Sequence, residues 1–196
     1  FVGDEKYRQI EKTGIGEVET VFQRKDGAVI HVLLRSSPVD RGDLAKGLTF
    51  TVLDIGERKR VEDALRSSET RFRELFQNAP VAYQVLDAEG RIMDVNNRWC
   101  RLLGYSREEV IGILIFDFMA YREQESARAS FVQKRDDGVV HHEGSERAFV
   151  TKEGDIRLLR SAFFMNRDDQ GKIISTLVTI EDITEMRQRE KELAVL

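Results

Sequence analysis

The chain has 196 residues, which is room for one large domain or one and a half ordinary ones, and its 34% charged and 41% hydrophobic residues suit a globular protein with a core. No apolar stretch approaches the roughly 18–20 residues that a membrane span needs, the first ten residues are too charged for a signal peptide, and the one cysteine, Cys100, excludes an intramolecular disulfide. The 31 basic and 35 acidic residues are interspersed and give a net charge of −4, so we expect a soluble, cytoplasmic protein that binds no nucleic acid.

An internal repeat organises the predicted elements. The segment 19–27 (ETVFQRKDG) recurs 127 residues later as 146–154 (ERAFVTKEG), and the segment 54–57 (DIGE) recurs 128 residues later as 182–185 (DITE). Two matches in the same order at nearly the same offset indicate two copies of one architecture. Each copy is predicted to run as strand, tight turn, strand, longer loop, strand and helix.

The first copy, residues 1–55, is predicted to be the C-terminal half of a domain. A helix is expected over Asp4–Lys12, and strands are expected over Ala28–Leu34 and Leu48–Leu53, of which the last alternates apolar residues with threonines. Nothing in this copy corresponds to residues 81–120 of the second copy. We therefore expect its sheet to need further residues or another chain as cover.

A connecting helix is predicted over residues 56–77, after the helix-start pattern Asp54-x-x-Glu57. Apolar positions along it are spaced four, three, four and three residues apart, which is typical of a heptad seam. One interpretation is a coiled coil between the two chains of a homodimer, and the other is an apolar stripe that packs on its own domain. The seam positions are Val61, Leu65, Ser68, Phe72 and Leu75.

The second copy, residues 78–184, is predicted to be a complete domain. A short helix is expected over Arg98–Leu103 and a longer one from about Tyr121 to Lys134, and residues 185–196 begin an output helix behind the second Asp-x-x-Glu pattern. The strands expected are Val81–Leu86, Arg91–Val95, Ile156–Met165 and Ile173–Ile180.

Each closing strand is predicted to meet its helix at an aspartate, Asp54 or Asp182. Both continue the parity of the apolar residues of the strand, so we expect each carboxylate to lean toward the covered face and to bind helix N–H groups or an arginine, with Arg58 as the partner of Asp54. The functional interpretation is a junction that relays strand position to helix orientation, although local capping alone requires the same residue. The junction residues are Asp54, Ile55, Glu57, Asp182, Ile183, Thr184 and Glu185.

These residues resemble two PAS (sensory box) domains in tandem. The resemblance rests on Val95-Asn96 before the short helix, on the string 103–112 (LGYSREEVIG), on the hairpin turns KDG and KEG, and on DITE at 182–185, while Gly56 departs from the usual threonine or serine. It implies an α+β fold with a five-stranded antiparallel sheet in the order 2-1-5-4-3, short helices on one face, and inter-domain and C-terminal signalling helices. It also implies a non-catalytic sensory module upstream of a histidine kinase, a diguanylate cyclase or another effector domain, acting as a dimer.

No catalytic or metal-binding pattern stands out. The chain has no phosphate-binding glycine loop, no Gly-x-Ser-x-Gly and no His-Glu-x-x-His, which argues against an enzyme. His141 and His142 are adjacent at the start of a predicted strand, so they point opposite ways and are expected to be solvated rather than to bind a metal. The resemblance argues against haem and a photoactive flavin adduct, because residues 121–134 contain no histidine and Cys100 lies in the earlier short helix, where we expect a structural cysteine.

The cleft that the resemblance implies has two open interpretations. In one it holds an unidentified small ligand, and the chain is a sensor that relays binding through the junction at 182–185. In the other it is filled by side chains, and the chain is a ligand-free spacer for dimerisation or protein interaction. The aromatic residues that line the cleft in the first case and fill it in the second are Trp99, Phe116, Phe118, Phe131, Phe149, Phe163 and Phe164.

Overall fold

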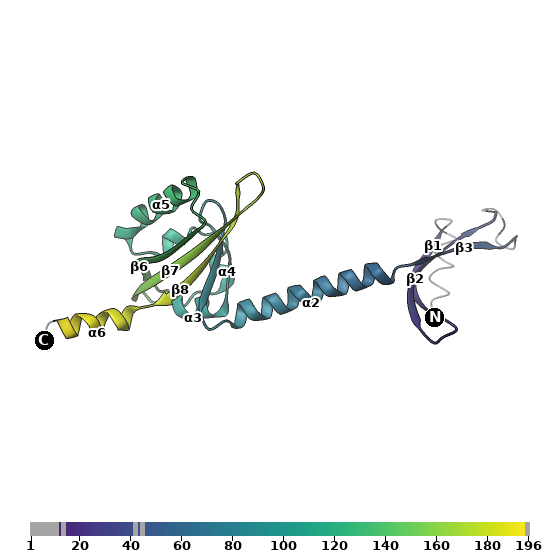
Figure 1. The fold of residues 1–196 in the computed structure, drawn as a ribbon, viewed down its shortest axis with the longest axis horizontal. Coiled ribbons are helices and arrows are strands. Elements are labelled where there is room, and N and C mark those ends of the chain that lie inside the picture. The colour runs from purple at the N-terminus through teal and green to yellow at the C-terminus, as the bar shows by residue number, and fades with distance from the viewer. Residues whose placement is uncertain (1–11, 13–14, 41–42, 44–45, 195–196) are drawn as a thin grey trace. The chain divides into compact units, whose positions relative to one another are not determined.

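The computed structural model describes residues 12, 15–40, 43 and 46–194, and the chain divides into two units, Phe1–Arg71 and Phe72–Leu196. The first unit is built on an antiparallel sheet in the order β1-β2-β3, followed by a long helix (Figure 1). The helix predicted over Asp4–Lys12 lies, apart from Lys12, outside the described residues. The bounds are β1 (Gly16–Gln23), β2 (Val29–Pro38), β3 (Leu48–Asp54) and α2 (Gly56–Asn78).

The second unit contains a five-stranded antiparallel sheet in the order β5-β4-β8-β7-β6. Numbered in chain order within the unit, this is 2-1-5-4-3, so the predicted α+β fold and strand order are confirmed. The strands are β4 (Ala82–Leu86), β5 (Ile92–Val95), β6 (His141–Val150), β7 (Ile156–Arg167) and β8 (Ile173–Asp182).

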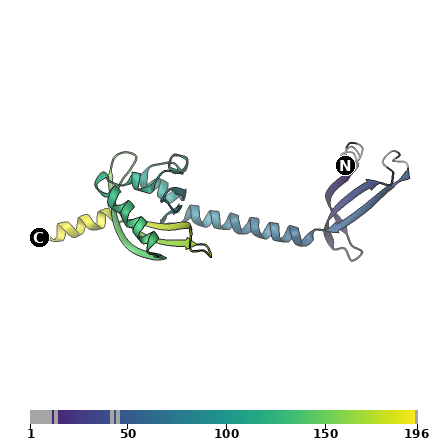
Figure 2. The same ribbon diagram turned by 90° about the horizontal axis from the view of Figure 1, so that it is seen from above.

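Helical segments between β5 and β6 cover one face of this sheet (Figure 1 and Figure 2). They contribute Trp99, Leu103, Val110 and Phe116 to a core that the strands complete with residues such as Ile180. None of the helices in the described part of the chain is both long and apolar enough to cross a membrane. The helices are α3 (Asn97–Leu103), α4 (Arg107–Val110), the 3-10 turn η2 (Ile115–Phe118), α5 (Tyr121–Asp136) and, after the sheet, α6 (Thr184–Ala194).

The strand registers show that the two sheets are copies of one arrangement. The pair Val32↔Asp54 in the first sheet corresponds to Leu159↔Asp182 in the second, 127 residues later on the first strand of each pair and 128 on the second. The inserted residue therefore lies in the loop between those strands. Both pairs contain a fully buried apolar residue beside the aspartate, since Val32 is 0% and Leu159 is 1% exposed.

The two copies differ in how well one face is covered. Phe50 and Val52 of β3 are 59% and 48% exposed, whereas their counterparts Val178 and Ile180 of β8 are 6% and 3% exposed. The second pair is buried because the segment between β5 and β6 packs on it. That further residues or another chain cover the first sheet stays a prediction.

Asn96 joins three elements of the second unit and is fully buried. Its Oδ1 accepts hydrogen bonds from the N–H groups of Trp99 (3.0 Å), at the start of α3, and Tyr83 (2.9 Å) of β4. Its Nδ2 donates to the carbonyl oxygens of Phe76 (3.0 Å), at the end of α2, and Val81 (2.9 Å). One amide side chain thus caps α3 and fixes the entry of the chain into the sheet.

We expect Asn96→Ala to lower the free energy of unfolding of the second unit by roughly 3 kcal/mol, because it removes a helix cap and leaves buried backbone groups unpaired. A urea titration followed by far-UV circular dichroism measures the change. The neighbouring Asn97 is exposed, so Asn97→Ala is the matched control and should change stability by no more than about 0.5 kcal/mol. Equal effects of the two substitutions would contradict this role of Asn96.

Candidate functional site

A cavity of about 80 Å³ lies between the sheet and the helical segments of the second unit. Four of the seven aromatic residues proposed for the cleft line it: Phe116, Phe131, Phe149 and Phe163. The rings of Phe116 and Phe131 meet edge to face at 5.7 Å between centroids, an arrangement that aromatic pairs favour. The cavity is therefore neither a large open cleft nor a completely filled core.

The other three aromatic residues do not line this cavity. Trp99 and Phe118 pack against each other edge to face, with ring centroids 5.9 Å apart, and fill the core beside it. Phe164 is 48% exposed, because neighbouring residues of a strand point to opposite faces and Phe163 takes the inner one. Assigning both Phe163 and Phe164 to one cleft was wrong for that reason.

Polar groups also face the cavity, and the sequence analysis did not identify them. The Lys134 ammonium, in the last turn of α5, donates to Ser145 Oγ (3.3 Å) and lies 5.5 Å from the centroid of the Phe163 ring. Burial, and then the charge of Arg147, lower the pKa of Lys134. Thr176, on the central strand β8, is 0% exposed, and its hydroxyl has no hydrogen-bond partner among the described residues.

The two adjacent histidines differ in environment. His141 is exposed, and its Nε2 lies 3.4 Å from Glu143 Oε1. His142 is partly buried in β6, with its ring 5.5 Å from that of Phe163 and its Nε2 3.1 Å from Ser145 Oγ. The expectation that both are solvated is wrong for His142, whose pKa is lowered first by burial and then by the charge of Lys134.

The described residues contain no group of three or more His, Cys, Asp or Glu side chains placed to hold a metal ion. Cys100 is partly buried against the core, and burial raises the pKa of its thiol. A thiol in such surroundings is a poor nucleophile and behaves as a small apolar side chain.

The junction between β8 and α6 is bonded to β7 at several points. Asp182 Oδ1 accepts from the Thr184 N–H (2.9 Å), and Asp182 Oδ2 accepts from Arg157 Nη1 (3.2 Å). Thr184 Oγ1 accepts from the Leu158 N–H (2.9 Å), and the Ile183 N–H donates to the Leu158 carbonyl (3.0 Å). Ile183, 1% exposed, anchors the segment in the core.

The junction between β3 and α2 repeats part of this pattern. Asp54 Oδ1 accepts from the Gly56 N–H (2.8 Å), and the Ile55 N–H donates to the His31 carbonyl (2.9 Å). Ile55 is 5% exposed, in the position of Ile183. Because Gly56 has no hydroxyl, the bond that Thr184 makes to β7 has no counterpart here.

Two expectations about the aspartates need correction. The partner of Asp54 is Arg24, with Nη2 3.9 Å from Oδ2, while Arg58 pairs with Glu19 instead. The aspartate side chains are also not covered: that of Asp54 is 55% and that of Asp182 27% exposed. Each is the last residue of its strand, where the cover ends although the parity of the strand continues.

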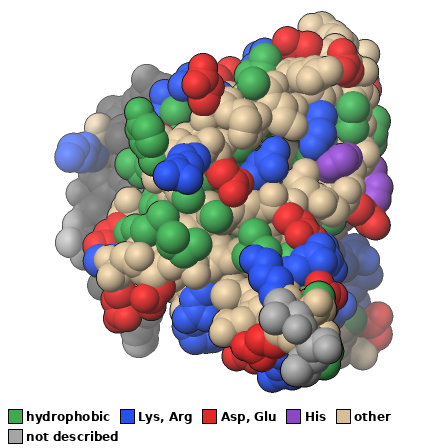
Figure 3. Space-filling view, turned by 90° about the vertical axis from the view of Figure 1, so that its left-hand side faces the viewer, with side chains coloured by type: hydrophobic (Ala, Val, Ile, Leu, Met, Phe, Trp, Pro, Cys, Tyr) green, Lys and Arg blue, Asp and Glu red, His purple; other side chains and the backbone are tan. Residues whose placement is uncertain are grey.

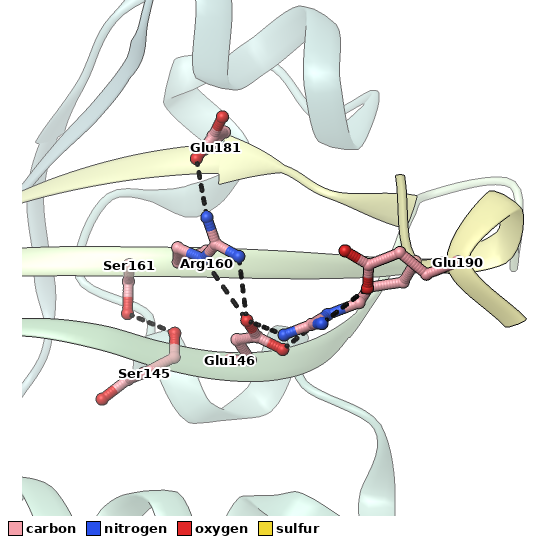
Figure 4. A network of polar contacts seen from close by, with 7 residues as sticks. Ser145, Glu146, Arg160, Ser161, Glu181 and Glu190 are labelled. Atoms are coloured by element: carbon pink, nitrogen blue, oxygen red, sulfur yellow. Dashed lines mark hydrogen bonds and ion pairs between the residues drawn. The ribbon is translucent and has the colours of Figure 1, made fainter. Parts of the chain in front are cut away.

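A glutamate on the first strand of each copy binds the helix that follows the sheet. Glu146 Oε1 accepts from Arg160 Nη2 of β7 (3.1 Å) and from Arg187 Nη2 of α6 (2.7 Å), and these bonds lower the pKa of Glu146, that of Arg187 most (Figure 4). Arg187 also pairs with Glu190 (2.7 Å). Hydrogen bonds to Glu146 and then Glu190 raise the pKa of Arg187.

In the first copy, Glu19 takes the same role with Lys59 Nζ of α2 at 2.6 Å, and its pKa is lowered by Lys59 and then by Arg58. The sequence analysis missed this pair of contacts. The signal was present, since Glu19 and Glu146 are the first residues of the repeated segment.

These ion pairs lie on a surface of mixed charge. Figure 3 shows basic and acidic side chains interspersed over the face that carries α6. Exposed pairs of this kind contribute only about 0–1 kcal/mol each to stability. Their effect is geometric, because Glu146 holds β7 and the first turn of α6 at one point.

A larger hollow of about 590 Å³ borders the same end of the sheet, with Arg98, Arg160 and Asp182 in its lining. Arg160 and Asp182 are already held in ion pairs. The smaller cavity therefore offers more unused binding groups.

Comparison with known proteins gives matches over both copies. The PAS domain family matches residues 2–57 and 80–185. Among curated proteins, "Probable diguanylate cyclase DgcE" of Escherichia coli (strain K12) is 27% identical over 135 residues, which is 69% of this chain and 12% of that protein. Sporulation kinase E of Bacillus subtilis (strain 168) is 28% identical over 189 residues, 95% of this chain and 24% of that protein.

A solved structure agrees with these matches. The PAS domain of an HTR-like protein from Haloarcula marismortui is 28% identical, has a TM-score of 0.55, and covers 64% of this chain and 99% of its own. The chain spans a quarter or less of the length of the two curated relatives. Together with the five-stranded sheet and the repeated junction, the two matched stretches show that the chain belongs to the PAS domain family, with its copies in tandem.

Proposed function

We propose that the second domain is the non-catalytic sensory module of a cytoplasmic signalling protein. A small ligand or partner at its cavity shifts the sheet, and the junction at 182–185 passes the shift through α6 to an effector domain outside this chain. Relatives that are a sporulation kinase and a diguanylate cyclase by name support an effector of the histidine kinase or diguanylate cyclase type.

The observation that carries the proposal is the double role of β6. Ser145 and Arg147 line the cavity, while Glu146 between them binds Arg187 of α6. Alternate residues of a strand point to opposite faces, so one strand contacts both the cavity and the output helix. A displacement of β6 by a ligand therefore moves the attachment point of α6 directly.

A ligand drives such a switch only if it binds one arrangement of α6 better than the other. The polar contacts at the junction are the groups that can exchange between two arrangements, because they are partly exposed and individually weak. The buried Ile183 acts as the fixed point about which they change.

We expect Asp182→Ala, in the full-length protein, to reduce the ratio of effector output between the activated and resting states several-fold. The substitution removes the bonds to the Thr184 N–H and to Arg157 without emptying a core position, so stability should fall by only about 1 kcal/mol. Effector activity in both states and thermal unfolding measure the two effects. Asp169→Ala, on the exposed β7–β8 loop, is the control; an unchanged output ratio in Asp182→Ala would discard the relay.

A second function, dimerisation, is favoured by the exposed stripe on α2. The residues of the predicted seam are far from covered in the single chain: Val61 is 63%, Leu65 60%, Phe72 68% and Leu75 68% exposed. We propose that a second copy of the chain covers them in a homodimer. The stripe would serve equally in a sensor or in a ligand-free spacer.

A further inference from the structure

The cavity of the second domain has one positive charge in its wall that no described acidic group neutralises. Lys134 donates to Ser145 Oγ and lies over the Phe163 ring, but among the described residues its ammonium forms no ion pair. Burial and the nearby Arg147 lower its pKa, which means that the charged form lacks compensation in the empty cavity. A bound anion would supply that compensation.

The second cation of the cavity is only partly neutralised. Arg147 Nε lies 3.8 Å from Glu123 Oε2, at the limit of an ion pair, and that oxygen accepts no hydrogen bond among the described residues. Lys134 and Arg147 together outnumber the single carboxylate of Glu123, and the nearby His142 adds no negative charge. The local balance therefore favours a ligand with one negative charge.

A buried hydroxyl points to the same cavity. Thr176 faces the helices from β8, between Leu86 of β4 and Met165 of β7. Its Oγ1 is fully buried and unpartnered in the described part of the molecule, although the residue lines the cavity. Buried polar groups are almost always hydrogen-bonded, so this hydroxyl indicates a missing polar partner.

Size and the remaining lining restrict the ligand further. A volume of about 80 Å³, at roughly 10–15 Å³ for each water-sized group, admits about five non-hydrogen atoms. The rest of the wall is apolar and includes Phe116, Phe131 and Val178. These features fit a small molecule with one charged end and a short apolar part.

Resting on the proposed sensory function, we propose that the cavity binds a short organic monocarboxylate, whose carboxylate pairs with Lys134 and whose second polar atom, where it has one, bonds to Thr176. The apolar part packs against the phenylalanine rings. Ser145, held by Lys134 and by His142, completes the polar end. The ligand thus contacts β6 beside Glu146, the residue that holds α6.

Calorimetric titration and thermal unfolding of the purified chain test this class of ligand. The probes are sodium acetate, propionate, lactate and pyruvate at constant ionic strength, with sodium chloride and the uncharged propionamide and lactamide as controls. We expect at least one carboxylate to bind with a dissociation constant of about 1 mM or less and to raise the melting temperature, while its amide binds at least about tenfold more weakly. The absence of carboxylate binding up to about 10 mM, or equal binding of acid and amide, would overturn the proposal.

Two lysine substitutions locate the site. Lys134→Met keeps the length of the side chain and removes its charge, and it should weaken the bound carboxylate at least about tenfold. Lys172→Met, on the exposed loop before β8, should leave binding unchanged. If both variants bind like the wild type, the proposal fails; if Lys134→Met does not fold, Lys134→Arg and the acid–amide comparison in the wild type decide.

The same probes separate this proposal from the sensory function. If no carboxylate binds but Asp182→Ala still reduces the output ratio, the ligand class is wrong and the relay stands. If a carboxylate binds through Lys134 but leaves effector output unchanged at saturation, the site is real and the sensory function fails.

Discussion

Replacing Trp99 by alanine is expected to lower the free energy of unfolding of the second domain by about 3–5 kcal/mol. The indole is 0% exposed and packs edge to face with Phe118. Its Nε1–H donates to Gln84 Oε1 at 2.7 Å, so the truncation leaves both a large void and a buried amide without its partner. Since domains of this size are stable by only about 5–15 kcal/mol, the variant should lie near the unfolding threshold.

Urea titration by circular dichroism measures this loss, and hydrogen exchange of the β8 amides assigns it to the second domain. Phe164→Ala is the matched control, because it removes an aromatic ring of the same sheet that is 48% exposed on the outer face. The control should cost less than about 1 kcal/mol. A loss below that value for Trp99→Ala would show that the core tolerates the void.

Replacing Leu65 by glutamate should weaken the proposed dimer at least about a hundredfold. In a two-chain seam the substitution places two carboxylates in an apolar contact, where desolvation and mutual repulsion add to several kcal/mol, and about 1.4 kcal/mol corresponds to each tenfold change. In the single chain Leu65 is 60% exposed, so the fold of the monomer should be unaffected. Light scattering over a concentration series measures the shift.

Thr70→Glu adds the same charge on the opposite side of the helix and is the control for the seam. It should leave the dimer mass unchanged. An intact dimer in Leu65→Glu would mean that the stripe does not form the contact between chains.

The strands and helices of this chain could be predicted because their signals are local or repeated. The heptad spacing, the hairpin glycines and the alternation in Leu48–Leu53 each depend on a few neighbouring residues, and the repeat confirmed one copy against the other. The backbone at Gly27 and Gly154, with φ of +86° and +94°, is the left-handed conformation that their turns require. Five-strand order followed from the family resemblance rather than from any single segment.

The side-chain partners of the site could not be predicted in the same way, because they depend on which elements meet. Arg24 approaches Asp54 from a hairpin turn, and Lys134 reaches the cavity from the last turn of α5. A lysine near the end of a helix is ordinarily a solvated residue that suits the helix dipole, so its sequence context carried no sign of a cavity. Phe163 and Phe164 are equally apolar, and only the register of β7 on β8 distinguishes them.

The alternation along β6 lets this domain change its ligand without losing its output. Mutations at 145, 147 and 149 alter the chemistry of the cavity, whereas the residue that grips the outgoing helix sits at 146 on the reverse side. Recognition and transmission can therefore diverge independently along a single strand. New specificities in this lineage need only a few substitutions on one side of it.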